Sequence, residues 1–355
     1  MIDVENIDEL IRYLRDSNRI ASSETLSIQI LTGGVSNKTL LVTRSGGDSW
    51  VVKQALPKLR VQSDWFSDPE RIRVEANGLR HLPRIAPEGS ITPLIFEDRS
   101  QRLLAMAAVP QPHQNWKERL LRGQVESEHF RQFAEIIGSI HRESTRSRPE
   151  FAALFATKEY FQTLRLEPYY EHTATVVPEA AQFLNELVQS TLCRSDALVH
   201  GDPSPKNVLI HNDRLILLDH EVLHFGDPAF DIGFSLTHFL SKALHLPRHR
   251  RQFAEAARLF WKVYCTKVHD MPWFTELKAR APKHTLASLL ARVCGRSPLE
   301  YLGKQERLVQ KQVVLEMIGE PQSDLDDLIT CFVHRVSVRD TNEPSLHPSQ
   351  ILRDL

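Results

Sequence analysis

Residues 200–233 read HGDPSPKNVLIHNDRLILLDHEVLHFGDPAFDIG, and this stretch decides the fold. Asp202 follows the apolar run DALV through a His-Gly-Asp turn, Asn207 comes five residues later, and Asp219 ends the run RLILLD. A base and two oxygen ligands for a hard cation such as Mg²⁺ are what phosphoryl transfer from a nucleotide requires. Taken singly, such residues are usually turn or cap residues. Their conjunction predicts a phosphoryl-transfer site.

Two further acids extend this site. Glu221 lies two residues after Asp219 and faces the same side if the backbone is extended, so it is a second candidate metal-facing carboxylate. Asp231, in GDPAFD, is expected either to cap the helix that follows or to hold the catalytic turn.

The region before residue 108 is predicted to be rich in strands. Residues 28–54 alternate short strand-like runs, and Ser45-Gly46-Gly47-Asp48 is a hairpin signal between two of them. Lys53 lies in the strand after this hairpin, where it can reach nucleotide phosphates, and Glu75 lies in the next predicted helix as its expected ion-pair partner. That helix is expected to begin at Ser67-Asp68-Pro69-Glu70, and Glu70 is expected to cap rather than pair with Lys53.

The remaining nucleotide contacts are predicted from position. The segment LTGGVSN occupies the place of a nucleotide-covering loop, although it lacks the full G-x-G-x-x-G pattern. Met106 ends a strand-like run at the expected connection between the lobes, where adenine would bond to the backbone. The candidate nucleotide-binding residues are Lys53, Glu75, Gly33, Gly34, Ser36, Asn37 and Met106.

Helical periodicity prevails after residue 108, except at residues 207–218. The expected fold class is therefore α+β, with a nucleotide-binding lobe at residues 1–108 and a larger, mainly helical catalytic and substrate-binding lobe at residues 109–355. Helices are predicted at residues 128–142, 179–193, 234–243, 248–267, 282–291 and 304–318, and residues 338–355 are predicted to form a loosely held tail.

Composition narrows the class of protein. The chain has 355 residues, of which 44 are Lys or Arg and 45 are Asp or Glu, so it lacks the basic surplus of a dedicated nucleic-acid binder. We find no signal peptide and no apolar run long enough to span a membrane. We expect a cytoplasmic protein, monomeric or homodimeric, that binds neither nucleic acid nor membranes.

The motif HGDPSPKNVLI…LLDHEVLHFGDPAFDIG resembles the signature of the aminoglycoside phosphotransferase and choline kinase superfamily, and the resemblance covers nearly the whole chain. It implies a protein-kinase-like fold, ATP as donor, Asp202 as catalytic base, His200 as support of the loop, and Mg²⁺ held by Asn207 and Asp219. The triplet Asp219-His220-Glu221 also resembles the Asp-x-Glu metal motif of 5-methylthioribose kinases, as does the segment around Trp65. Asn207 stands where those enzymes carry a serine.

The acceptor is not readable from these motifs. Residues 241–300 contain twelve Lys and Arg but only four Asp and Glu, which argues against a polycationic antibiotic and favours a neutral polyol or an anionic acceptor. Charges of this kind more often form a solvated face. The leading hypothesis is an ATP-dependent kinase of a small-molecule hydroxyl group; the alternatives are a non-catalytic nucleotide-binding protein of the same fold and an aminoglycoside-modifying enzyme. A protein kinase is disfavoured because no long activation segment follows Asp231.

Overall fold

The strand-like runs near the N-terminus pair into one antiparallel sheet of five strands, in the order β1-β2-β3-β5-β4. The computed structural model describes residues 1–32, 34–61, 64–320 and 324–341. Trp50 pairs with Val42 and with Ala107, which puts β3, the strand that carries Lys53, at the centre of the sheet. The strands are β1 (Leu26–Ile30), β2 (Asn37–Arg44), β3 (Ser49–Ala55), β4 (Leu94–Asp98) and β5 (Leu103–Ala107).

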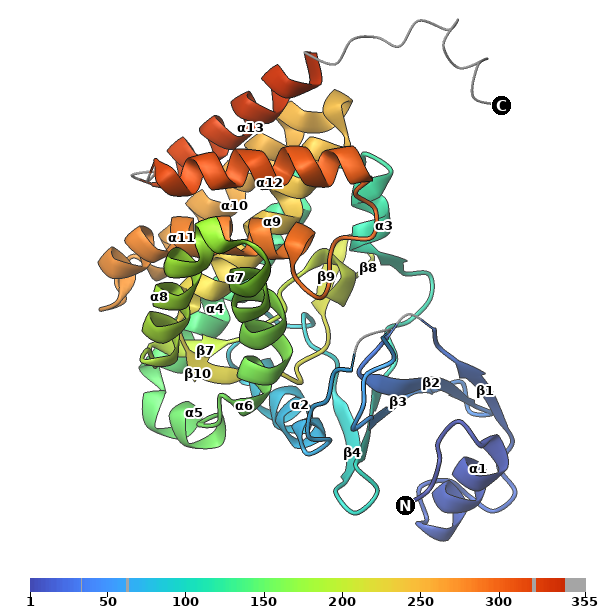
Figure 1. Cartoon of the computed structure of the whole chain (residues 1–355). Coiled ribbons are helices and arrows are strands. Elements are labelled where there is room, and N and C mark those ends of the chain that lie inside the picture. The colour runs from blue at the N-terminus through green and yellow to red at the C-terminus, as the bar shows by residue number, and fades with distance from the viewer. Residues whose placement is uncertain (33, 62–63, 321–323, 342–355) are drawn as a thin grey trace, which may run out of the picture.

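Alternating side chains let this sheet pack on both faces. On one face, Leu103 and Ala105 join the apolar cluster made with α1 (Ile7–Asp16). On the other face, Leu104 and Met106 join the main core together with α2 (Arg71–His81). Helix α2 therefore lies between the sheet and the rest of the molecule, as Figure 1 shows.

The larger lobe is mainly helical and lies on the far side of α2 (Figure 1). Its central helix is α9 (Pro228–His245), in which every side chain from Pro228 to Leu244 is buried. The other α-helices are α3 (Trp116–Leu121), α4 (Ser127–Arg146), α5 (Arg148–Leu154), α6 (Glu159–Phe161), α7 (His172–Val176), α8 (Ala181–Leu192), α10 (Arg250–Val268), α11 (Phe274–Cys294), α12 (Lys304–Gly319) and α13 (Leu325–Thr341).

Short strands and turns in this lobe hold the polar motif. Strands β7 (Ala197–Val199) and β10 (His224–Gly226) pair with each other, and β6 (Gln114–Asn115), β8 (Val208–His211) and β9 (Arg214–Leu217) form a second small sheet. The irregular helices are η1 (Leu82–Arg84), the π-helix η2 (Gln162–Glu171), η3 (Pro178–Ala180), η4 (Pro205–Asn207) and η5 (Pro247–His249).

The structure corrects several predicted boundaries. Helix α2 begins at Arg71, and the Glu70 side chain makes no capping bond, because its carboxylate pairs with Arg73 at 3.3 Å instead. Helix α9 begins at Pro228, six residues before the predicted start, because Asp227 caps it by accepting the Ala229 N–H at 3.0 Å.

The predicted helix at 282–291 is only part of α11, which continues through Pro282. The predicted tail at 338–355 is wrong at its beginning, since α13 extends to Thr341. Within the described residues, no helix combines the length and the apolar character needed to cross a bilayer.

Candidate active site

The two lobes meet at Lys53. Its Nζ lies 2.6 Å from Glu75 Oε1 on α2 and 3.0 Å from Asp219 Oδ1 in the larger lobe. Burial raises the pKa of Glu75 to about 7, against the opposing effect of the Lys53 ammonium. Burial also disfavours the charge of Asp219, but Lys53 and Lys206 hold the pKa of that carboxyl well below its usual value. The predicted contact between Lys53 and Glu75 is present, and Asp219 shares the same ammonium.

Glycine lets α2 approach the segment that follows Asp219. A Cβ on Gly78 would lie 2.6 Å from Leu223 Cδ1 and 2.8 Å from His220 Cβ, so any side chain there would push the helix away. Asp219 itself has a φ of 67°, in the left-handed region. The backbone is therefore not extended from Asp219 to Glu221, which was the condition for the two carboxylates to face the same side.

Glu221 is nevertheless near the other acids. One ligand atom from each of Glu75, Asp219 and Glu221 lies within 4.8 Å of the others. Glu221 Oε2 also lies 3.1 Å from Arg71 Nε and accepts a bond from Asn37 Nδ2 at 2.9 Å. Glu221 therefore ties the larger lobe to the small one in addition to facing the acid cluster.

Arg71 is a fully buried cation that the sequence analysis missed. It donates to the carbonyl oxygens of Ser36 and Leu56, the latter at 3.0 Å, and to the Ser67 carbonyl at 3.2 Å. It thus fixes the described part of the predicted nucleotide-covering loop to α2. Its only signal in the sequence was its place in the first turn of a helix.

The catalytic-loop candidate is held from behind by Asp231. The Asp231 carboxylate accepts the backbone N–H groups of His200 at 2.7 Å and Gly201 at 2.9 Å. Gly201 has a φ of 78°, and a Cβ there would lie 2.9 Å from Val222 Cγ2. Asp231 was expected either to cap the following helix or to hold the catalytic turn, and in the structure its carboxylate holds the turn.

Asp202 lies between two cations. Arg165 Nη2 is 2.8 Å and Lys206 Nζ 3.0 Å from Asp202 Oδ2. Both carboxylate oxygens are buried without a hydrogen bond among the described residues, and Oδ1 has no ion-pair partner there either. Burial opposes ionisation, but Arg165 and Lys206 hold the pKa of Asp202 below its ordinary value. A hydroxyl group that donated to Oδ1 would satisfy this atom.

Arg165 is the second cation that the sequence analysis missed. It comes from the π-helix η2, and its Nε donates to the Gly201 carbonyl at 2.7 Å. The same helix receives the predicted Trp65 loop, because Trp65 Nε1 donates to the Thr163 carbonyl at 3.0 Å. Helix η2 has no local motif, so only its contacts reveal its connection to the site.

Asn207 and His200 adjoin Asp202 in different ways. Asn207 Nδ2 donates to the Asp202 carbonyl at 3.1 Å, and the Leu218 N–H donates to the Asn207 carbonyl at 2.9 Å, next to Asp219. His200 Nδ1 accepts the Asp202 N–H at 3.2 Å, and the ring is fully buried. His200 is thus packed behind the loop rather than facing solvent.

The other nucleotide-binding candidates lie along the small lobe. Gly34 and Ser36 precede β2, and Asn37 begins it; Gly33 lies outside the described residues. Met106 is buried in β5, and its sulfur lies 3.5 Å from Thr92 Oγ1. Its side chain therefore packs inside the lobe.

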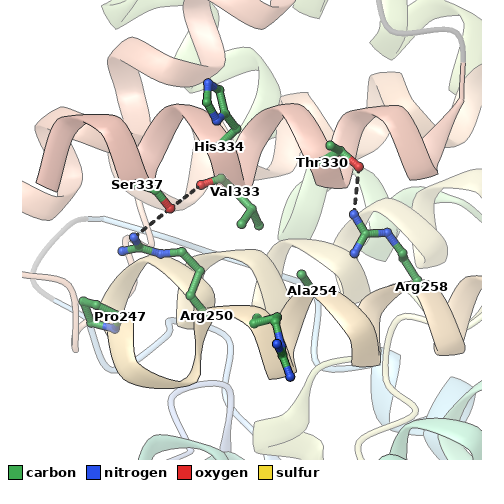
Figure 2. A pocket seen from close by; sticks show the side chains of 9 residues that line it. Pro247, Arg250, Ala254, Arg258, Thr330, Val333, His334 and Ser337 are labelled. Atoms are coloured by element: carbon green, nitrogen blue, oxygen red, sulfur yellow. Dashed lines mark hydrogen bonds between the residues drawn. The ribbon is translucent and has the colours of Figure 1, made fainter. Parts of the chain in front are cut away.

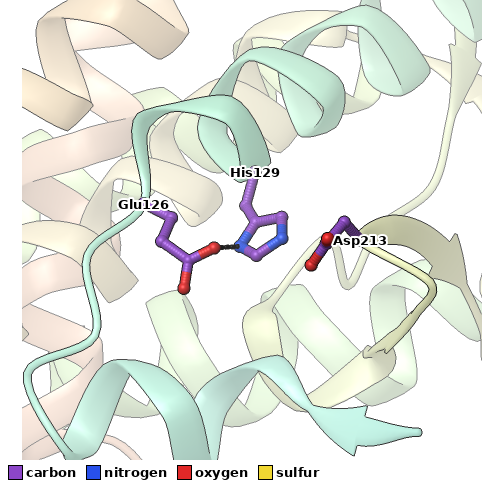
Figure 3. A group of neighbouring side chains, drawn as sticks. All are labelled: Glu126, His129 and Asp213. Atoms are coloured by element: carbon purple, nitrogen blue, oxygen red, sulfur yellow. Dashed lines mark ion pairs between the residues drawn. The ribbon is translucent and has the colours of Figure 1, made fainter.

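Two other polar groupings lie outside this site. A groove of about 430 Å³ between α10 and α13 is lined by arginines already bonded to Ser337 and Thr330 (Figure 2). The exposed Glu126 and Asp213 approach the buried His129, with His129 Nδ1 3.5 Å from Glu126 Oε2 (Figure 3). Neither grouping includes a predicted site residue.

The fold and the family comparison define a small-molecule kinase with two lobes. The sequence model of the phosphotransferase enzyme family matches residues 27–264, and the chain belongs to this family. This finding confirms the predicted superfamily and the α+β, kinase-like fold.

The chain is also similar to individual proteins. Methylthioribose kinase of Pectobacterium carotovorum subsp. carotovorum is 21% identical over 374 residues, covering 93% of this chain and 91% of the relative. An amicoumacin kinase solved with AMP-PNP, Ca²⁺ and Ami aligns with a TM-score of 0.55 and 16% identity, over 82% of this chain and 88% of that one. Choline kinase of Cryptosporidium parvum Iowa II aligns with a TM-score of 0.51 and 14% identity, over 96% of each chain. The structural likenesses bear on the fold alone.

Proposed function

We propose that this chain is an ATP- and Mg²⁺-dependent kinase that phosphorylates a hydroxyl group of a small molecule. The observation that carries the proposal is the ammonium of Lys53 between Glu75 and Asp219, because a lysine held in this way is the phosphate-binding cation of kinases. Related methylthioribose kinases support the choice of a small-molecule acceptor.

In the proposed reaction, Asp202 accepts the proton of the acceptor hydroxyl. The acceptor oxygen forms a bond to the γ-phosphorus while the bond from that phosphorus to the β–γ bridging oxygen breaks, and ADP leaves with its electron pair. Arg165 and Lys206 keep the Asp202 carboxylate ionised and oriented. The unpartnered Oδ1 is the atom that we assign to the acceptor.

The side chains present fit a magnesium ion bound to ATP phosphates. Asn207 and Asp219 supply the oxygen donors that Mg²⁺ prefers, and Glu221 is a further carboxylate beside them. When bound, the ion neutralises the phosphate charge that develops during transfer. Lys53, Gly34, Ser36 and Asn37 line the proposed nucleotide side, and we assign the adenine to the strand end at Met106.

We also propose that the lobes divide near residue 108. In support, β5 ends at Ala107, and the next strand, β6, already pairs with β8 of the larger lobe. The cytoplasm, where ATP is plentiful, is the proposed location.

The test is replacement of Asp202. We expect Asp202→Ala to lower kcat for phosphate transfer by about 10³-fold, because it removes the proton acceptor. Stabilisation by Mg-ATP in a thermal-shift assay should be retained. Turnover at the wild-type rate would overturn the assignment, and stabilisation by Mg-ATP without turnover on any acceptor would favour a non-catalytic nucleotide-binding protein.

A further inference from the structure

A buried lysine lies near the end of α9 without a counter-charge. Lys242 is fully buried, and no carboxylate within the described part of the chain forms an ion pair with it. Its ammonium donates to the His238 carbonyl at 3.2 Å and lies 5.0 Å from the centre of the Tyr301 ring. Burying an unpaired ammonium is costly, so the protonated form of Lys242 lowers the stability of the folded chain.

The polar atoms around Lys242 are also unsatisfied. His238, Ser241 and Lys242 share one face of α9, because they are spaced by three and four residues. His238 Nε2, Ser241 Oγ and the Tyr301 hydroxyl are buried, and none of them has a hydrogen-bond partner among the residues that the structure describes. Buried groups of this kind are normally paired, so their gathering here indicates a missing ligand.

A second cation lies beside this cluster. Arg292 on α11 is buried, and its Nη1 donates to the Tyr169 hydroxyl at 3.0 Å, while its Nε has no partner among the described atoms. Burial, and then the positive charges of Arg292 and Lys242, lower the pKa of His238 well below its ordinary value.

This cluster is connected to Asp202 through aromatic side chains. The Arg165 guanidinium, which pairs with Asp202, lies 6.0 Å from the centre of the Tyr169 ring. Phe234 of α9 then lies between Tyr169 and His238, with ring centres 5.9 Å and 5.2 Å away. The cluster of His238, Ser241, Lys242, Arg292 and Tyr301 is thus connected to the proposed base through Arg165, Tyr169 and Phe234.

Glu300, a carboxylate whose charge acts on Lys242, does not neutralise this cluster. Glu300 pairs with Lys117, so that carboxylate is already engaged. Burial, the Lys117 ammonium and the Arg292 guanidinium lower the pKa of Lys242 to about 7, and Glu300 offsets only part of this effect. A bound anion would supply the charge that the protein omits.

We propose that the acceptor carries a carboxylate or phosphate group, which Lys242 and Arg292 bind with the hydroxyl groups of Ser241 and Tyr301, while an acceptor hydroxyl faces Asp202. This inference rests on the proposed kinase function and names the substrate class of the same site. It excludes cationic amino alcohols and aminoglycosides, because a cation beside Lys242 and Arg292 would be repelled.

The test compares acceptors matched in size. ADP release is measured with D-glycerate, sn-glycerol 3-phosphate, glycerol and 2-amino-1,3-propanediol, and with ribonate and ribose 5-phosphate against methylthioribose. We expect kcat/KM for the acidic members to exceed that of their neutral partners by on the order of 10- to 100-fold, as hydrogen bonds to a charged group allow. Comparing the carboxylate acceptors with the phosphate acceptors shows which of the two anionic groups the site binds.

Substitutions of Lys242 and Tyr301 test whether these residues cause the preference for acidic acceptors. Lys242→Met should lower kcat/KM for the preferred acid by a similar factor and leave the neutral acceptor within about threefold, since only the charged contact is lost. Tyr301→Phe should weaken the acid less and provides a second, milder variant. Lys283→Met, on the exposed side of α11, should change nothing.

The outcomes separate the two proposals. Equal or better turnover of neutral or cationic acceptors would overturn the anion proposal and leave the kinase proposal standing. An acid preference that survives in Lys242→Met would also overturn it. ADP release from no acceptor of the panel, despite stabilisation by Mg-ATP, would contradict the kinase proposal itself.

Discussion

At the scale of single residues, the proposed site contains buried charged groups that are not fully paired with opposite charges. Asp202 has two cations on one oxygen and none on the other, whereas Lys242 forms no ion pair with an acid among the described residues. A buried charge with a full set of partners needs no ligand. A buried charge without a partner lowers the stability of the fold, and a bound ligand of opposite charge can offset this loss. These two residues therefore mark the two places where we expect the acceptor to touch the protein.

Arg165 provides a residue-scale prediction. Arg165→Met removes a 2.8 Å ion pair with Asp202 and the bond to the Gly201 carbonyl, so the carboxylate loses its orientation. We expect kcat to fall about 100-fold, as for the loss of a positioned electrostatic partner, with the thermal shift by Mg-ATP unchanged. Arg122→Met, at an exposed arginine, is the control. A kcat within threefold of wild type in Arg165→Met would contradict the role of this residue.

Lys242 provides a prediction about stability and pH. Its pKa is lowered in the folded protein, so between about pH 7 and its ordinary value of 10.5 the unfolded chain binds more protons than the folded one. The stability of the wild type should therefore rise with pH in this window relative to Lys242→Met, by about 1.4 kcal/mol for each unit of lowering.

The measurement is the melting temperature of both proteins from pH 6.5 to 9.5 in chloride buffer. Lys242→Met should be the more stable protein at pH 6.5, and its advantage should shrink as the pH rises. The charges of Lys117, Glu300 and Arg292 also act on Lys242. Lys283→Met removes a lysine from the surface instead and serves as the matched control. A difference that does not change with pH would show that the folded and unfolded chains bind the same number of protons, and would contradict a lowered pKa of Lys242 in the folded protein.

At the scale of elements, α2 sets the distance between the lobes. It presents Glu75 to Lys53 and Arg71 to Glu221, and Gly78 lets it lie against the loop after Asp219. One helix therefore fixes both the proposed phosphate-binding lysine and the proposed metal-binding acids. Its position decides whether the two halves of the site can act together.

Replacing Arg71 tests this role of α2. Arg71→Met leaves the buried Glu221 carboxylate with Asn37 as its one hydrogen-bond partner among the described residues and frees the Ser36 carbonyl. Breaking a buried ion pair costs about 3–5 kcal/mol, so we expect a lower melting temperature and a higher KM for ATP. Arg73→Met, on the exposed side of the same helix, should be nearly neutral. Equal effects of the two substitutions would contradict this account.

The elements also show what the sequence could predict. The spacing within residues 200–219 is local, so Asp202, Asn207 and Asp219 could be grouped before their positions were known. The pairing of Lys53 with Glu75 followed from the order of strand and helix. Arg165 and Arg71 could not be found in this way, because they reach partners 36 and 150 residues away through packing alone.

Other elements were mispredicted for local reasons. Pro282 is typical of a helix start, but α11 continues through it because tertiary packing outweighs one missing hydrogen bond. The strand β10 has three residues, which is too short for an alternating pattern to show. The π-helix η2 contains Pro168 and also has no regular pattern.

At the scale of the whole molecule, the small lobe contributes the proposed nucleotide side and the larger lobe the proposed base and acceptor side. The contacts of Lys53 with Asp219 and of Asn37 with Glu221 cross between them. The central claim is that these parts together transfer phosphate from ATP to a hydroxyl group of an anionic small molecule, with Asp202 as base.

The most direct measurement follows the ³¹P NMR spectrum of ATP, Mg²⁺ and D-glycerate or ribose 5-phosphate with the wild type and with Asp202→Ala. We predict that the wild type converts the γ-phosphate signal into a new phosphate monoester on the acceptor, and that Asp202→Ala forms it about 10³-fold more slowly. Formation of inorganic phosphate alone, or equal ester formation by both proteins, would contradict the account.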